Sequence, residues 1–128
     1  MSDLMKYDEL YRVLAGSAAL MAKVTGIYDS PPADAESPYI AMSTVQAAND
    51  ELLDNSESEI TVDLDVWARA GASAGARKQI LEINDLIAAA VPDWALYDGI
   101  VIMRDAGEPD WWHGVVTLRY YDRRKVNG

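Results

Sequence analysis

Two aspartates are the first residues in this sequence whose types and spacing could do chemistry. Asp63 and Asp65 lie two positions apart, which on a β-strand places both carboxylates on one face, where they could hold a hard cation. Thr61 and Trp67 share that face, and no glycine-punctuated calcium loop is present. We therefore interpret the pair as the polar side of an amphipathic strand.

No other group of residues has the pattern of a catalytic site. His113, the single histidine, could serve as a general base, but the sequence has no serine nucleophile elbow and no second histidine. Gly71 and Gly75 frame a G-A-S-A-G segment that lacks the Lys-Ser/Thr pair of a phosphate-binding loop. The absence of cysteine excludes disulfides and thiolate zinc sites. We predict no catalytic, cofactor-binding or metal-binding residues, and no enzyme activity.

The charge of the chain is unevenly distributed. The 128 residues carry a net charge of −10; residues 1–68 hold 13 acids and 3 bases, whereas residues 69–128 hold 8 of each. An acidic surface repels phosphate backbones, which argues against DNA binding by charge neutralisation. The sequence has neither a signal-peptide pattern nor a run of about 20 apolar residues. We expect one soluble intracellular domain over residues 1–128, without membrane contact.

The elements that must position any site are predicted from apolar spacing. Steps of three and four residues predict helices over 3–23 and 74–91, and a proline-rich loop at 29–38 follows the first helix. Four strands are predicted, and they span residues 39–46, 59–69, 100–104 and 111–124. In the second strand Ile60, Val62, Leu64 and Val66 share one face, and in the fourth strand Trp112, Gly114, Val116, Leu118 and Tyr120 do so.

These elements predict an α+β fold. Short links between the strands favour antiparallel hairpins, and both helices then pack on one face of the sheet. The predicted architecture is a two-layer sandwich of a four-stranded, mostly antiparallel sheet with two helices, in the order α-β-β-α-β-β. The ordered core is expected over about residues 3–123, with an acidic loop at about 47–58 and a frayed end at 125–128.

Large aromatic side chains on the two longest strands indicate a contact surface. Neighbours such as Trp111 and Trp112 point to opposite faces of a sheet, so only one of each pair can lie in the core. The second face is covered either by a partner or by a helix or loop of the same chain. The residues expected at a subunit or partner interface are Trp67, Arg69, Trp111, Trp112, Arg119, Tyr121, Arg123 and Arg124.

The basic C-terminal end adds a second argument for self-association. A homo-oligomer could place this end of one copy against the acidic first half of the next, in a head-to-tail contact that closes into a ring. The alternative is a solvated basic terminus without a partner.

Three segments, in this order and spacing, carry a resemblance to a known family. They are V-T-G-I-Y-D-S-P-P at residues 24–32, S-P-Y-I at 37–40 and V-D-L-D-V-W-A-R at 62–69. Together with the helix before them and the C-terminal hairpin, the chain resembles the tail-completion or tail-terminator proteins of long-tailed phages, prophages and gene-transfer agents. The resemblance covers about residues 4–123.

The resemblance implies a structural virion protein without a cofactor. Family members form a ring, typically a hexamer, at the head-proximal end of the tail tube, where the ring ends tube polymerisation and joins the tail to the head. The implied partners are further copies of the chain, the tail tube protein and a head–tail connector or stopper. The implied location is the head–tail junction of the virion, with the bacterial cytoplasm during assembly.

In such a ring we expect DNA to pass through without specific binding. A negatively charged wall lets DNA slide without sticking. The residues expected to face the channel are Asp50, Glu51, Asp54, Glu57 and Glu59.

Two other functions stay open at this point. One is a different ring component of the head–tail junction, such as a stopper or connector. The other is a small cytosolic enzyme or ligand-binding domain that uses the tryptophan-rich sheet as a pocket.

Overall fold

A computed structural model of the chain describes residues 2–49, 57–69, 75–107 and 110–123. The elements are α1 (Ser2–Ala15), α2 (Ala18–Met21), β1 (Ile27–Tyr28), β2 (Tyr39–Asn49), β3 (Glu57–Arg69), α3 (Ala76–Ala90), β4 (Ala95–Arg104) and β5 (Trp111–Arg123). No helix in these ranges is long and apolar enough to cross a membrane.

The sheet has five strands, in the order β1-β2-β3-β5-β4, so the predicted four-stranded sheet was one strand short. The additional strand, β1, pairs in parallel with β2, and the other three pairings are antiparallel. β1 contains only Ile27 and Tyr28, and two residues are too few to produce a detectable alternation. The α+β class is confirmed, but the strand number and order differ from the prediction.

The number of helices also differs from the prediction, because the helix expected over residues 3–23 is two helices. α1 ends at Ala15, before Gly16, and Ser17 caps the start of α2 by accepting a hydrogen bond from the Leu20 N–H at 3.2 Å. Glycine is a poor helix former and serine is a preferred N-cap, so the break has a local cause. Apolar spacing alone does not detect it, since Leu14 and Leu20 are both fully buried in the same core.

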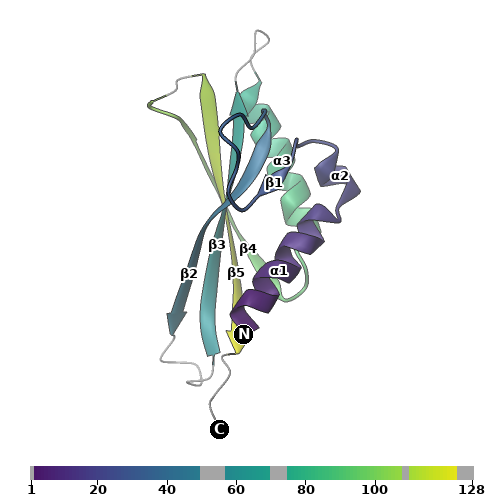
Figure 1. Cartoon of the computed structure of the whole chain (residues 1–128), viewed down its shortest axis with the longest axis vertical. Coiled ribbons are helices and arrows are strands. Elements are labelled where there is room, and N and C mark those ends of the chain that lie inside the picture. The colour runs from purple at the N-terminus through teal and green to yellow at the C-terminus, as the bar shows by residue number, and fades with distance from the viewer. Residues whose placement is uncertain (1, 50–56, 70–74, 108–109, 124–128) are drawn as a thin grey trace.

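All three helices lie on one side of the twisted sheet (Figure 1). α1 and α3 pack on the sheet, α2 packs on these two helices, and the core lies between the helices and the sheet. The predicted alternation of β3 is confirmed, since Ile60, Val62, Leu64 and Val66 are all buried. β5 contributes Gly114, Val116, Leu118 and Tyr120 to the same side, as predicted, and α3 contributes Ile80, Ile83 and Ile87.

β4 begins five residues earlier than the predicted strand 100–104. Its pairing with β5 shifts register between Tyr97 and Gly99, so Asp98 is an additional residue in the strand. Gly99 adopts a φ of +128°, which residues with a side chain rarely adopt. This bulge interrupts the alternation that would identify the first half of the strand.

The register of β3 and β5 defines two ends of the sheet. At one end Arg69 lies opposite Trp111, and at the other Glu57 lies opposite Arg123. We call these the Trp111 end and the Arg123 end. β2 pairs with β3 along the same ladder, and its last residue, Asn49, is at the Arg123 end.

A glycine in β5 permits a close contact between the two layers. A Cβ atom on Gly114 would lie 2.5 Å from Cγ2 of Ile80 on α3 and 3.2 Å from Cδ1 of Ile100 on β4. Ile80 is fully buried and branched at Cβ, so it has no free space to move into. The packing of α3 on the sheet therefore depends on the missing side chain at Gly114.

We expect Gly114→Ala to lower the free energy of unfolding by about 1–3 kcal/mol, because the added methyl group overpacks the core. Urea unfolding followed by circular dichroism measures this change. Gly107→Ala is the control, since the nearest atom to an added Cβ there is 3.9 Å away. Equal stability of the two variants would contradict the account of this contact.

α1 is joined to the segment that follows β1 by a short hydrogen bond. The Tyr7 hydroxyl donates to Oδ1 of Asp29 at 2.6 Å. The pKa of the Tyr7 phenol lies well above its usual range. Burial is the main cause, and this hydrogen bond to Asp29 is the second. The folded protein therefore holds the Tyr7 proton more tightly than the unfolded chain does.

Tyr7→Phe should lower the free energy of unfolding by about 0.5–1.5 kcal/mol near neutral pH, because the bond to Asp29 is lost. The contribution of Tyr7 is complete below pH ~10, where the unfolded tyrosine is still protonated, and declines as the pH rises above that value. The stability difference from wild type should therefore narrow above pH ~10 in urea unfolding curves. Tyr11→Phe, at an exposed position on the same helix, is the control. A difference that stays constant with pH would overturn this interpretation.

Candidate interaction surface

The sheet face opposite the helices is the candidate functional surface, and we call it the open face. Its β3 residues, which include Thr61, Asp63, Asp65 and Trp67, are half-buried because they alternate with the core residues. The β4 residues on this face are more exposed, with Val101 at 61%. None of the three described helices packs on this face.

Five ring side chains form an aromatic cluster at the Trp111 end of the open face. Trp67 stacks on His113 with ring centres 4.1 Å apart and an angle of 3° between the planes. Trp111 meets Trp67 edge-on at 6.3 Å and Tyr39 edge-on at 5.9 Å. Tyr39 in turn contacts Tyr28 of β1 at 6.1 Å. Burial, followed by the nearby Asp65 carboxylate, raises the pKa of the Tyr39 phenol.

The two aspartates of β3 contact different side chains on β5. Nε2 of His113 lies 3.0 Å from Oδ1 of Asp65, and the Thr117 hydroxyl donates to Oδ1 of Asp63 at 3.1 Å. Within the described ranges, no group of three His, Asp or Glu side chains is placed to hold a metal ion. These contacts join neighbouring strands, and His113 is packed against Trp67.

Charged side chains at the Arg123 end of the open face are joined within the chain. Nε of Arg119 lies 3.2 Å from Oδ2 of Asp98, the bulge residue of β4, and Nη1 lies 3.6 Å from Oε2 of Glu59. The Tyr121 hydroxyl donates to the same Glu59 oxygen at 3.3 Å. The Asp98 carboxylate raises the pKa of the Arg119 guanidinium above its usual value. Arg119, expected at an interface, therefore contacts Glu59, which was expected to face a channel.

The other expected interface residues lie in three places. Trp67 and Trp111 belong to the aromatic cluster, and the exposed Arg69 follows at the end of β3. Trp112 faces the helix side, as its place beside Trp111 predicts. The backbone of Arg123 is opposite that of Glu57.

Several residues of the expected interface and channel stay predictions. Asp50, Glu51, Asp54 and Arg124 lie outside the described residues, as does the expected frayed end at 125–128. Glu57 and Arg123 are described by their backbone alone. The channel-facing role of the acids is therefore an expectation from the sequence.

Sequence reasoning missed two residues beside Trp112. The guanidinium carbons of Arg77 on α3 and Arg104 on β4 lie 4.9 and 5.0 Å from the centre of the Trp112 ring. Arg77 and Arg104 are 27 positions apart, and no spacing rule brings them together. The alternation of β4 places Arg104 on the helix side, but the approach of α3 is a tertiary contact.

The three motif segments meet behind the aromatic cluster. The Ile40 N–H donates to the Gly26 carbonyl at 3.0 Å, and the Thr25 N–H donates to the Pro38 carbonyl at 2.8 Å. The Arg69 N–H donates to the Ser37 hydroxyl at 2.8 Å. Segments that are separate in sequence thus build one end of the sheet.

Comparison with known proteins agrees with this fold. A chain in the solved structure "Virion of native gene transfer agent (GTA) particle" superposes with a TM-score of 0.62 at 18% sequence identity, over 89% of this chain and 91% of that chain. At this identity the likeness is one of fold. No curated protein gives a significant match. The family model of the tail completion protein gp17 matches residues 8–121, and the chain therefore belongs to that family.

Proposed function

We propose that this protein forms a hexameric ring on the head-proximal end of the tail tube of a phage or gene transfer agent. The ring ends tube polymerisation and joins the tail to the head. The observation that carries the proposal is the family match over residues 8–121, which supports a structural role in the tail. The fold shared with a chain of a gene transfer agent virion supports a place in the particle.

The open face and the edge of the sheet beside it supply a surface for such contacts. β4 is an edge strand, and its open-face residues Leu96, Val101 and Met103 are 48%, 61% and 44% exposed. An apolar edge strand favours association with another chain, which would remove these side chains from water. We assign this surface to contacts with further copies or with the tail tube protein, and the opposite side of the ring to a connector or stopper.

The function is tested with particles that lack this protein. The proposal predicts tail tubes of irregular length that are not joined to heads, as seen by electron microscopy. Tubes of normal length without heads would favour the stopper or connector role instead. Tubes of normal length joined to heads would contradict the proposal.

The double substitution Val101→Asp and Met103→Asp should prevent the protein from binding to tube ends, because it places two negative charges on the apolar part of the open face. Both side chains are exposed, so the free energy of unfolding should change by less than about 1 kcal/mol. Co-sedimentation with purified tubes measures the binding.

Val45→Asp is the matched control for this pair. Val45 is 50% exposed on β2 and lies opposite the buried Val62, so its side chain is on the helix side of the sheet. This variant should bind tubes normally. If the Val101 and Met103 variant also binds normally, the open face is not the surface that contacts the tube.

A further inference from the structure

A basic hollow lies on the helix side of the sheet, at the Trp111 end. It has a volume of about 530 Å³ and is open to solvent. Its lining residues are Gly75, Ala76, Arg77, Lys78, Leu81, Arg104 and Trp112. The lining thus includes three cationic side chains, Arg77, Lys78 and Arg104, and two large apolar ones, Leu81 and Trp112.

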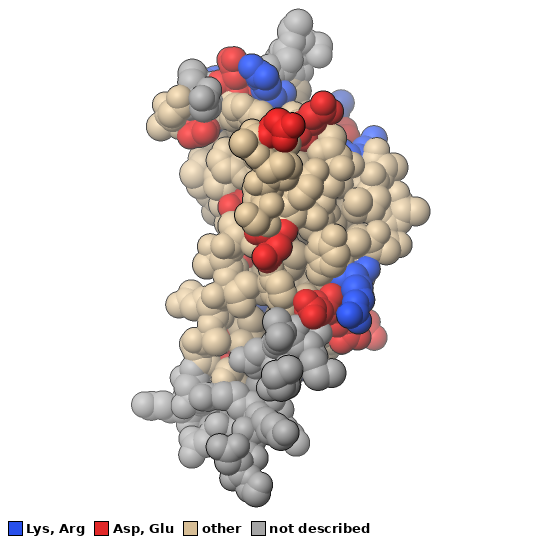
Figure 2. All heavy atoms as spheres, viewed as in Figure 1, with Lys and Arg blue, Asp and Glu red and all other residues tan. Residues whose placement is uncertain are grey.

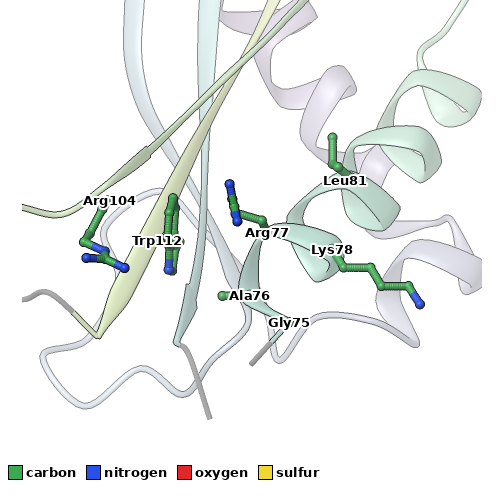
Figure 3. A pocket seen from close by; sticks show the side chains of 7 residues that line it. All are labelled: Gly75, Ala76, Arg77, Lys78, Leu81, Arg104 and Trp112. Atoms are coloured by element: carbon green, nitrogen blue, oxygen red, sulfur yellow. The ribbon is translucent and has the colours of Figure 1, made fainter. Parts of the chain in front are cut away.

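Both arginines lie over the indole ring of Trp112. Figure 3 shows Arg77 and Arg104 on opposite sides of Trp112, with Lys78 directed away from the ring. Stacking on an aromatic face orients a guanidinium and leaves its N–H groups free to donate. Among the described residues, no carboxylate makes an ion pair with Arg77, Lys78 or Arg104. The hollow therefore collects positive charge that no described carboxylate pairs with.

The lining chemistry selects a ligand that combines carboxylates with apolar side chains. Residues 50–57 of this chain read D-E-L-L-D-N-S-E, with four acids, no base and two adjacent leucines. The acids complement the cationic lining residues, and the leucines complement Leu81 and Trp112. A nucleic acid is a poorer match, because the chain has a net charge of −10.

The hollow and the two residues that bound this stretch lie at opposite ends of the sheet. The hollow is at the Trp111 end, since Arg104 lies opposite Trp112. The stretch connects Asn49 to Glu57 in sequence, and both are at the Arg123 end. Figure 2 shows one group of Lys and Arg side chains toward the upper end of the molecule and another near mid-height on its right side. The geometry thus favours a contact between different copies.

We propose that the hollow is the docking site for residues 50–57 of a second copy of this chain. This docking site rests on the proposed function, because it requires that copies of the chain associate. It identifies the residues through which they would do so. Such a contact joins unlike surfaces head to tail, which closes into a ring when the rotation between copies allows. It assigns the acidic stretch to a contact between subunits, in place of the channel wall expected from the sequence.

A pair of charge-reversal variants tests the contact. One variant carries Arg77→Glu and Arg104→Glu, and the other carries Asp50→Lys, Glu51→Lys and Asp54→Lys. Each alone places like charges at every contact, so each should lose the wild-type oligomer, measured as solution mass by light scattering at low salt. An equimolar mixture restores opposite charges at every contact between alternating copies, so the oligomer should return.

Arg12→Glu with Lys23→Glu is the matched control, because it reverses two exposed cations away from the hollow. It should assemble as wild type does. Normal assembly of the arginine variant, or a mixture of folded variants that stays monomeric, overturns the proposal.

A peptide titration tests the hollow even when the wild-type protein is monomeric without a tube. The probe is a synthetic peptide of residues 49–58, and its control has Asn and Gln in place of Asp and Glu. The acidic peptide should shift the Trp112 indole signal in NMR spectra of the full chain, and Arg77→Gln with Arg104→Gln should abolish the shift.

Three results of the titration would overturn the docking site. They are no shift at millimolar peptide, equal shifts with both peptides, and displacement of the peptide by equimolar inorganic phosphate. A wild-type protein that neither associates nor affects tail length would contradict the proposed function instead, so the two failures are distinguishable.

Discussion

The antiparallel ladder between β3 and β5 is the contact on which the rest of the structure depends. It runs without a register shift from Glu57 and Arg123 at one end to Arg69 and Trp111 at the other. Because side chains alternate along both strands, this one register sends Val62 and Leu118 to the helices and Trp67 and His113 to the open face. A slip of one residue would exchange the core with the open face.

Alternation explains which parts of the fold the sequence predicts well. The core faces of β3 and β5 follow directly from apolar periodicity, and both are confirmed. The parts that were missed lack that signal. β1 has two residues, β4 contains a bulge at Asp98, and the break after α1 depends on a glycine and a serine cap. Local irregularities of this kind are set by tertiary contacts and by single residues.

The residues of the candidate interaction surface also divide into those that alternation predicts and those that it does not. Strand parity predicts that Trp111 and Trp112 face opposite sides, and the structure has them so. The alternation of side chains along a strand does not predict which charged groups contact each other. Arg119 contacts Asp98 through the bulge and Glu59 across the strands, and Arg77 reaches Trp112 from α3. The net charges of the two halves of the sequence therefore describe the composition of the surface. They do not predict where its cationic side chains lie.

Two distinct surfaces follow from this arrangement, the apolar part of the open face along the β4 edge and a basic hollow on the helix side. A tail completion protein of the proposed kind needs at least two, one for neighbouring copies and one for the tube. Cryo-electron microscopy of intact particles tests this central claim most directly. The account predicts one closed ring of this chain at the head-proximal end of the tube. Copies distributed along the tube, or absent from its head-proximal end, would contradict it.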